Sequence, residues 1–144
     1  MLPEFTEDGL LPAGIHRATL AQFKERFAVF SRSDRRFQIG KQVERLIADA
    51  RKSGIVRSVL MAGSYVTAKA EPNDFDCIVV LEQSVVGATL APFQYNLVSR
   101  KMARRMYGGD VTPAIEGSAA LEQYIEFFQR TREGKQAGIV EIVL

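Results

Sequence analysis

Two apolar runs, separated by a short turn-rich segment, constrain the fold of this 144-residue chain more than any other feature. Residues 55–62 have the sequence Ile-Val-Arg-Ser-Val-Leu-Met-Ala, and residues 74–81 have the sequence Asp-Phe-Asp-Cys-Ile-Val-Val-Leu. Short apolar runs bounded by Gly, Pro and Asn are typical of strands in the interior of a sheet. The sequence therefore predicts two buried strands, the first of which ends at Gly63-Ser64.

The rest of the chain predicts helices that are mixed with further strands. Apolar residues spaced three and four apart favour helices over residues 20–30, from residue 33 or 34 to 53, over 93–106 and over 119–130. Further strands are expected over residues 110–115 and 138–144, and an irregular arm over residues 1–16. Because the elements mix without strict alternation, the expected fold class is α/β or α+β, a mixed sheet flanked by helices.

The length favours a single domain over residues 1–144, with residues 1–53 forming an N-terminal arm and helices. Apolar residues make up 47% of the chain, which excludes a disordered protein. The single cysteine, Cys77, excludes an intrachain disulfide, and the single histidine, His16, excludes a multi-histidine metal centre. No apolar run approaches the ~18 residues that span a bilayer, and the acidic N-terminus does not resemble a signal peptide. We therefore expect a cytoplasmic protein without a membrane partner.

The net charge of +2 conceals an uneven distribution of charge. Residues 17–57 carry eleven Lys or Arg against four acids, whereas residues 58–99 carry one Lys against four acids. Four further basic residues share one helical face, namely Arg100, Lys101, Arg104 and Arg105. Two explanations are open for the basic segments: solvated helix faces, or a surface that binds polyanions beside an acidic metal site.

Asp74 and Asp76 are the strongest candidates for chemistry. Alternate residues of a strand point to the same face, so the two carboxylates are expected side by side, with Phe75 facing the other way. Their mutual repulsion falls if a divalent cation lies between them or if one carboxylate takes a proton. Carboxylate oxygens suit Mg²⁺ or Mn²⁺. The alternative for an isolated Asp-x-Asp is a solvated strand end.

The Gly63-Ser64 turn ahead of the acids is a candidate phosphate site. Glycine lets a phosphate approach the backbone, and the neighbouring N–H groups and the Ser64 hydroxyl can donate to it. Thr67 and Lys69, in the segment that follows, are further candidates for phosphate contact. Thr67 is equally suited to cap a short helix, and Lys69 to be a flexible exposed side chain. Tyr65 is expected in the core.

Ala62-Gly63-Ser64, a spacer of nine residues and Asp74-Phe75-Asp76-Cys77 together resemble the signature of the DNA polymerase β-like nucleotidyltransferases. In that superfamily a strand and turn present Gly-Ser, and the next strand presents the acidic pair. The chain is also similar to small bacterial proteins of this fold over residues 11–16, 63–76 and 138–142. The resemblance implies a minimal nucleotidyltransferase fold, Mg²⁺ or Mn²⁺ as the metal, and a nucleoside triphosphate such as ATP as the substrate.

The resemblance also implies a third carboxylate on a neighbouring strand, which joins Asp74 and Asp76 as a catalytic metal ligand. Asp110 is the better match because it begins an extended segment, and Glu116 is its competitor. The expected enzyme moves a nucleoside monophosphate to a hydroxyl. Its acceptor stays open between a protein, RNA, a small alcohol and an antibiotic.

A second function is kept open beside the enzyme: a nucleotidyltransferase-like binding module, catalytically weak or inactive, that acts as an antitoxin or defence-system subunit. Some minimal nucleotidyltransferases belong to toxin–antitoxin or phage-defence pairs, so the resemblance implies a protein partner for such a module. The position of Asp110 separates the two functions, because the enzyme needs its carboxylate to converge with those of Asp74 and Asp76.

Overall fold

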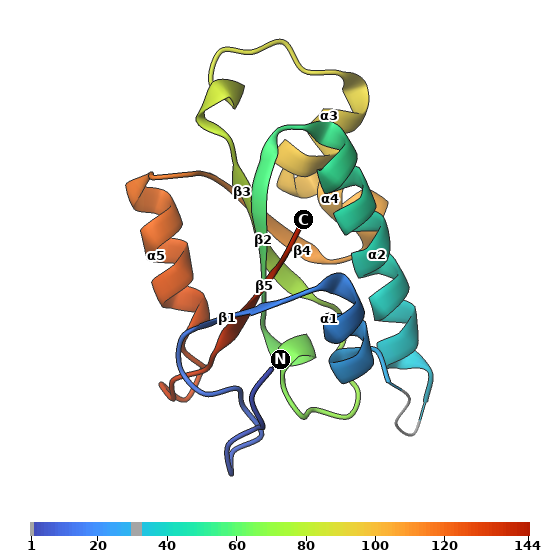
Figure 1. Cartoon of the computed structure of the whole chain (residues 1–144), viewed down its shortest axis with the longest axis vertical. Coiled ribbons are helices and arrows are strands. Elements are labelled where there is room, and N and C mark those ends of the chain that lie inside the picture. Colours follow the sequence, from blue (N-terminus) through green and yellow to red (C-terminus); the bar gives the residue numbers. More distant parts are fainter. Residues whose placement is uncertain (1, 30–32) are drawn as a thin grey trace.

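The computed structural model of the chain describes residues 2–29 and 33–144. These residues form one five-stranded sheet with helices on both faces (Figure 1). The strands are β1 (Ile15–Ala18), β2 (Val56–Ala62), β3 (Asp76–Leu81), β4 (Asp110–Ile115) and β5 (Ile139–Ile142). The helices are α1 (Leu20–Phe27), α2 (Arg35–Ser53), α3 (Pro92–Val98), α4 (Arg100–Tyr107) and α5 (Ala119–Phe128), with 3-10 turns η1 (Ser64–Val66) and η2 (Gln83–Val85). The predicted fold class, a mixed sheet flanked by helices, is confirmed.

The order of strands in the sheet is β1-β5-β2-β3-β4, so both strands that were predicted to be buried lie in its interior. β2 runs antiparallel to β3 and to β5, whereas β3 and β4 are parallel, as are β1 and β5. Pro113 lies in β4 at the edge of the sheet. Such a strand tolerates proline because one of its sides has no partner.

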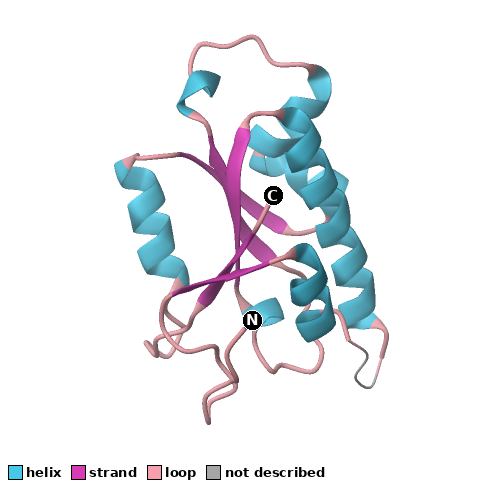
Figure 2. Ribbon diagram, in the orientation of Figure 1, coloured by secondary structure: helices cyan, strands magenta, loops and turns pink. Residues whose placement is uncertain are grey.

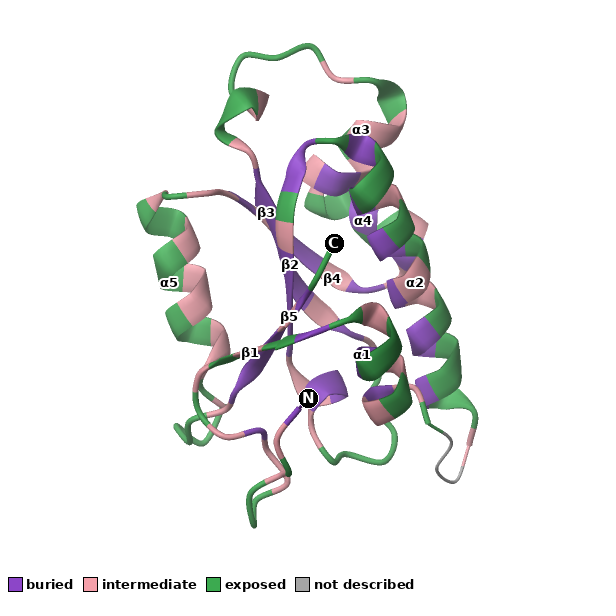
Figure 3. Ribbon diagram, in the orientation of Figure 1, coloured by how far each residue is buried: buried purple, intermediate pink, exposed green. Residues whose placement is uncertain are grey.

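The helices cover the two faces of the sheet unequally (Figure 2). α1 to α4 pack on one face over the main core, which includes Phe23, Phe27, Leu46 and Tyr65. α5 alone covers the other face, over a small cluster around Ile78, and buries none of its own residues fully (Figure 3). Within the described residues, no helix is long and apolar enough to cross a membrane.

The prediction of an irregular arm over residues 1–16 is wrong at its end, because β1 begins at Ile15. β1 pairs in parallel with β5, at the other end of the chain. Gly138 permits this approach, since a side chain there would overlap the carbonyl oxygen of Pro12 and crowd the ring of His16. A four-residue strand whose partner is so distant in sequence gives almost no local signal.

The single helix predicted over residues 93–106 is also wrong, because the chain forms α3 and α4 with a break at Ser99. Ser99 has an extended backbone, with φ −117° and ψ 119°, and its hydroxyl accepts a hydrogen bond from the Met102 N–H. It therefore begins α4 as an N-cap. The first helix ends earlier than expected, at Phe27, and residue 30 lies outside the described residues.

Candidate active site

Asp76 and Asp110 lie directly opposite each other, because they are the first residues of two parallel strands in register. The Asp110 N–H also donates a hydrogen bond to the Phe75 carbonyl at 2.9 Å. The structure thus brings Asp110 to the acidic pair. Glu116, the competing acid, follows the opposite end of β4 and forms an ion pair with Arg57 at 3.4 Å.

Asp74 lies in a bend before β3, so the expectation that it is a strand residue beside Asp76 is wrong. Its carboxylate nevertheless lies close enough to Asp76 to act on it electrostatically. Burial, followed by the charges of Asp74 and Asp110, raises the pKa of Asp76 to about 6, although Arg104 acts in the opposite direction. Three carboxylates therefore share one small region, and the middle one retains a proton more readily than an isolated aspartate.

Gly63 lies against the carboxylate of Asp76. Its backbone has φ +74°, and a side chain at this position would overlap the Asp76 carboxylate group. Both the backbone conformation and the close approach require glycine. Ser64 begins η1 directly after it, and its hydroxyl has no hydrogen-bond partner among residues 2–29 and 33–144. The glycine turn and Asp76 are therefore in contact.

Thr67 closes the turn after η1 with its side chain. Its hydroxyl donates to the Ser64 carbonyl at 2.7 Å and accepts a hydrogen bond from the Lys69 N–H at 3.2 Å. This arrangement matches the capping alternative for Thr67. Lys69 is exposed. Tyr65 is fully buried, as predicted, and its hydroxyl donates to the Arg36 carbonyl at 2.9 Å.

Arg36 is the structural residue that sequence reasoning missed. Only 5% of it is exposed, and its guanidinium donates five hydrogen bonds to backbone carbonyls. These carbonyls belong to Phe27, Tyr65, Thr67 and Lys69. Arg36 thereby fixes the segment that joins the glycine turn to the acids. The signal available in the sequence was its place on the apolar stripe of α2, at i−3 from Ile39 and i−7 from Val43.

Two arginines of α4 point at the acids. Arg104 Nη1 lies 2.7 Å from Asp74 Oδ2 and 3.3 Å from the Gly108 carbonyl oxygen, and Arg100 Nη2 lies 3.1 Å from Asp110 Oδ1. The hydrogen bond to Asp74 raises the pKa of Arg104. Lys101 and Arg105, which are exposed like the other two, have no ion-pair partner among residues 2–29 and 33–144. The basic residues of this helix are therefore divided into two that pair with the acids and two that do not.

In the described parts of the chain, no three His, Cys, Asp or Glu side chains are arranged to hold a metal ion. Two of the three aspartates are engaged elsewhere, because Asp74 and Asp110 each form an ion pair with an arginine. Carboxylate oxygens are nevertheless the donors that Mg²⁺ prefers. The donor set therefore fits Mg²⁺ in its chemistry.

Fold and site together define a small α+β protein with three aspartates and a glycine turn gathered where β2 ends and β3 and β4 begin. The chain belongs to DUF6932, a family of unknown function, which it matches over residues 3–143. Comparisons with curated proteins and with solved structures gave no match.

Proposed function

We propose that the protein is a Mg²⁺-dependent nucleotidyltransferase, which moves a nucleoside monophosphate from a nucleoside triphosphate to a hydroxyl acceptor. One observation supports this most: the parallel register of β3 and β4 places Asp110 beside Asp76, while Gly63 lies against the same Asp76 carboxylate. Carboxylates for a metal and backbone N–H groups for a phosphate are thus available within one site.

Each side chain has a role in this proposal. Asp74, Asp76 and Asp110 hold Mg²⁺ or Mn²⁺, which when bound neutralises phosphate charge and lowers the pKa of the attacking hydroxyl. Ser64 donates its unused hydroxyl to the terminal phosphates, together with the N–H groups of the turn that Gly63 opens. Lys69, exposed beside the turn, adds a cation. Thr67 supports the turn and makes no phosphate contact, because its hydroxyl is already used within the turn.

The reaction balances without any further reactant. The acceptor oxygen forms a bond to the α-phosphorus as the bond between that phosphorus and the β-bridging oxygen breaks. The hydroxyl proton passes to Asp110, and pyrophosphate leaves. Asp110 suits this step because it is the first residue of β4, the strand at the edge of the sheet. An acceptor can approach its carboxylate from that edge.

Arg100 and Arg104 change partners in this proposal. In the absence of nucleotide they neutralise Asp110 and Asp74. With a triphosphate and its cation bound, Asp74 and Asp110 would hold the cation, and Arg104 and Arg100 would be free to pair with the phosphates. Guanidinium suits both partners, because its N–H groups match carboxylate and phosphate geometry equally well.

The test is a transfer assay with labelled ATP, GTP, CTP and UTP, Mg²⁺ and candidate acceptors, run beside calorimetry with nonhydrolysable analogues. We expect Mg²⁺-dependent nucleotide binding and transfer, and a loss of transfer of about 100-fold or more in Asp76→Asn. Glu116→Gln is the matched control, since it removes one acid at the far end of β4 and should leave transfer intact. Absence of nucleotide binding and transfer with all four nucleotides contradicts the proposal.

The two ion pairs favour a second candidate, a nucleotidyltransferase-like module that serves as an antitoxin or defence-system subunit. Arg100 and Arg104 already neutralise two of the three acids, which a module without a metal would require. This candidate predicts no transfer and an equimolar protein partner that co-purifies with the chain. Both candidates place the protein in the cytoplasm, where nucleoside triphosphates and such partners are found.

A further inference from the structure

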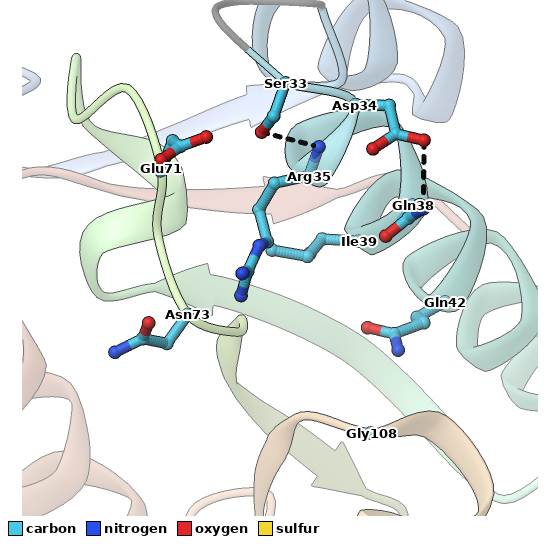
Figure 4. Close-up of a pocket in the computed structure, with 9 residues that line it drawn as sticks. All are labelled: Ser33, Asp34, Arg35, Gln38, Ile39, Gln42, Glu71, Asn73 and Gly108. Carbon is cyan, nitrogen blue, oxygen red and sulfur yellow. Dashed lines mark hydrogen bonds between the residues drawn. The ribbon is translucent and has the colours of Figure 1, made fainter.

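Two glycines, Gly108 and Gly109, form the whole connection between α4 and β4, and each lies against a side chain. Gly108 has a left-handed backbone, with φ +79°, and a Cβ there would lie 2.7 Å from Gln42 Nε2. Gly108 and Gln42 also line a polar cavity of about 340 Å³, and in Figure 4 the Gln42 carboxamide extends from α2 toward the Gly108 connection. The connection is thus in close contact with α2.

Gly109 lies against the ring of Phe75. A side chain at Gly109 would overlap three atoms at the end of that ring, Cε1, Cε2 and Cζ. Gly109 does not share the positive φ of Gly108, so its backbone conformation is open to other residues. The ring of Phe75, and not the backbone, is therefore what excludes a side chain at this position.

The ring of Phe75 has little freedom to move aside. Phe75 is fully buried in the main core, on the face of the sheet that α1 to α4 cover. Protein interiors are packed as densely as organic crystals, so an added methyl group forces neighbouring atoms apart. An enlarged residue at Gly109 would therefore displace the start of β4 from Phe75.

The contact between Phe75 and Gly109 is one residue away from the acids on both strands. Gly109 precedes Asp110, and Phe75 precedes Asp76, its opposite residue in the register of β3 and β4. The backbone adds a second contact, since the Asp110 N–H donates to the Phe75 carbonyl at 2.9 Å. Phe75 therefore holds the first residues of both strands through its ring and its carbonyl group.

The ring and the carboxylates lie on opposite faces of the sheet. Alternation along β3 places the Asp76 side chain on the face of Ile78, which belongs to the cluster beneath α5. Phe75 belongs to the core on the other face. The ring can therefore fix the spacing of the two strands without occupying the space in which a cation and a substrate would bind.

We infer that Phe75 and Gly109 are positioning residues of the proposed metal site, because their contact sets the separation of Asp76 and Asp110. The inference rests on the proposed function. Mg²⁺ holds its oxygen ligands at about 2.0–2.1 Å in a nearly ideal octahedron, so it tolerates little change in the separation of two carboxylates. Residues that orient metal ligands from behind typically change metal affinity by about 10- to 100-fold when they are replaced.

The test measures Mg²⁺ affinity by calorimetry in the presence of a saturating nonhydrolysable triphosphate analogue. We expect Gly109→Ala to weaken Mg²⁺ binding by about 10-fold or more. Gly40→Ala is the matched control, because Gly40 is also buried and a Cβ there would lie 2.6 Å from Ala28 Cβ. It overpacks the core between α1 and α2, away from the acids, and should leave the Mg²⁺ affinity unchanged. Urea denaturation of both variants measures the stability that each one loses.

A second substitution tests whether the ring is the cause. Phe75→Leu removes the three ring atoms that a side chain at Gly109 would overlap. Alone it should weaken Mg²⁺ binding by about 3-fold or more, because Gly109 loses its contact. Combined with Gly109→Ala it should bind Mg²⁺ more tightly than Phe75→Leu alone, because the added methyl group fills the space of the ring. The same methyl group thus weakens binding beside the ring and strengthens it when the ring is shortened.

The outcomes separate this inference from the proposed function. Wild-type Mg²⁺ affinity in Gly109→Ala, or an equal loss in Gly40→Ala, overturns the positioning role and leaves the nucleotidyltransferase standing. If Gly109→Ala does not fold, Phe75→Leu and the double variant decide the question, and a double variant that binds Mg²⁺ no more tightly than Phe75→Leu overturns the inference. If the wild-type protein binds no Mg²⁺ with any of the four triphosphate analogues, the proposed function fails and the inference fails with it.

Discussion

At the scale of single residues, Asp76 links stability to pH in a direction that the structure determines. Its pKa is raised to about 6, chiefly by burial and then by Asp74 and Asp110. A carboxyl group with a raised pKa in the folded state stabilises the fold fully only below its unfolded pKa, near 3.9. That stabilisation is lost as the pH rises through about 6. Above that pH the ionised carboxylate opposes folding.

We therefore predict that Asp76→Asn is more stable than the wild-type protein at pH 8, by about 1 to 2 kcal/mol, when EDTA removes divalent cations. The difference should fade as the pH is lowered to 4, where the wild-type carboxyl group is itself protonated. Urea denaturation at both pH values measures it. Equal stabilities of the two proteins at pH 8 would mean that ionised Asp76 does not oppose folding. The same variant should lose nucleotide transfer, so stability and function change in opposite directions.

At the scale of elements, α2 organises the site through one side chain. The guanidinium of Arg36 satisfies four backbone carbonyls between Phe27 and Lys69, and two of them, those of Thr67 and Lys69, belong to the segment after η1. Buried carbonyls without a donor cost about 1–3 kcal/mol each. The segment between Gly63 and Asp74 therefore depends on a helix that contributes no residue to the chemistry.

We predict that Arg36→Gln lowers the free energy of unfolding by about 3 kcal/mol or more, because a glutamine cannot reach all four carbonyls. Arg35→Gln, at the exposed neighbouring position, removes the same charge and should change stability by no more than about 0.5 kcal/mol. Chemical denaturation followed by circular dichroism gives both values. Hydrogen exchange should also accelerate locally over residues 65–69 in Arg36→Gln. Equal effects of the two substitutions would mean that the buried hydrogen bonds contribute little.

Elements with local signals could be predicted from the sequence, and those that depend on distant partners could not. Gly54 ends α2 in the left-handed conformation, as expected of a glycine after a helix. Ser99, however, interrupts an apolar pattern that continues through it, so two helices were predicted as one. β1 is short and depends on β5 for its pairing, and nothing within residues 1–16 indicates that partner.

At the scale of the whole molecule, the convergence of the acids depends on a crossover that the sequence does not specify. Asp74, Asp76 and Gly63 could be predicted as neighbours because one turn connects them. Asp110 reaches them only because α3 and α4 return the chain to form β4 parallel to β3, in register from the first residue. The same crossover delivers Arg100 and Arg104 to the acids. The break at Ser99 sets the direction of α4, so these ion pairs could not be inferred from helical periodicity.

This arrangement of the whole site predicts that Mg²⁺ and nucleotide bind cooperatively. Mg²⁺ alone must displace the arginines from Asp74 and Asp110, and a triphosphate alone can pair with the arginines only by leaving these carboxylates uncompensated. When both bind, each charged group exchanges one partner for another. We expect a shift in Tm below about 2 °C with Mg²⁺ or a nonhydrolysable triphosphate alone, and of about 5 to 10 °C with both at roughly 100 times their Kd.

Matched pairs of substitutions in α4 identify the cause of that cooperativity. Arg100→Ala combined with Arg104→Ala frees Asp110 and Asp74, so Mg²⁺ alone should now raise the Tm of this variant. The additional rise in Tm with the triphosphate should decrease, because its guanidinium partners are gone. Lys101→Ala combined with Arg105→Ala removes the same charge from exposed positions of the same helix and should preserve the wild-type pattern. Thermal unfolding of the three proteins with each ligand and with both measures the coupling. If the wild-type protein responds to Mg²⁺ alone as strongly as to the mixture, the arginines do not compete for the acids, and the exchange of partners is wrong.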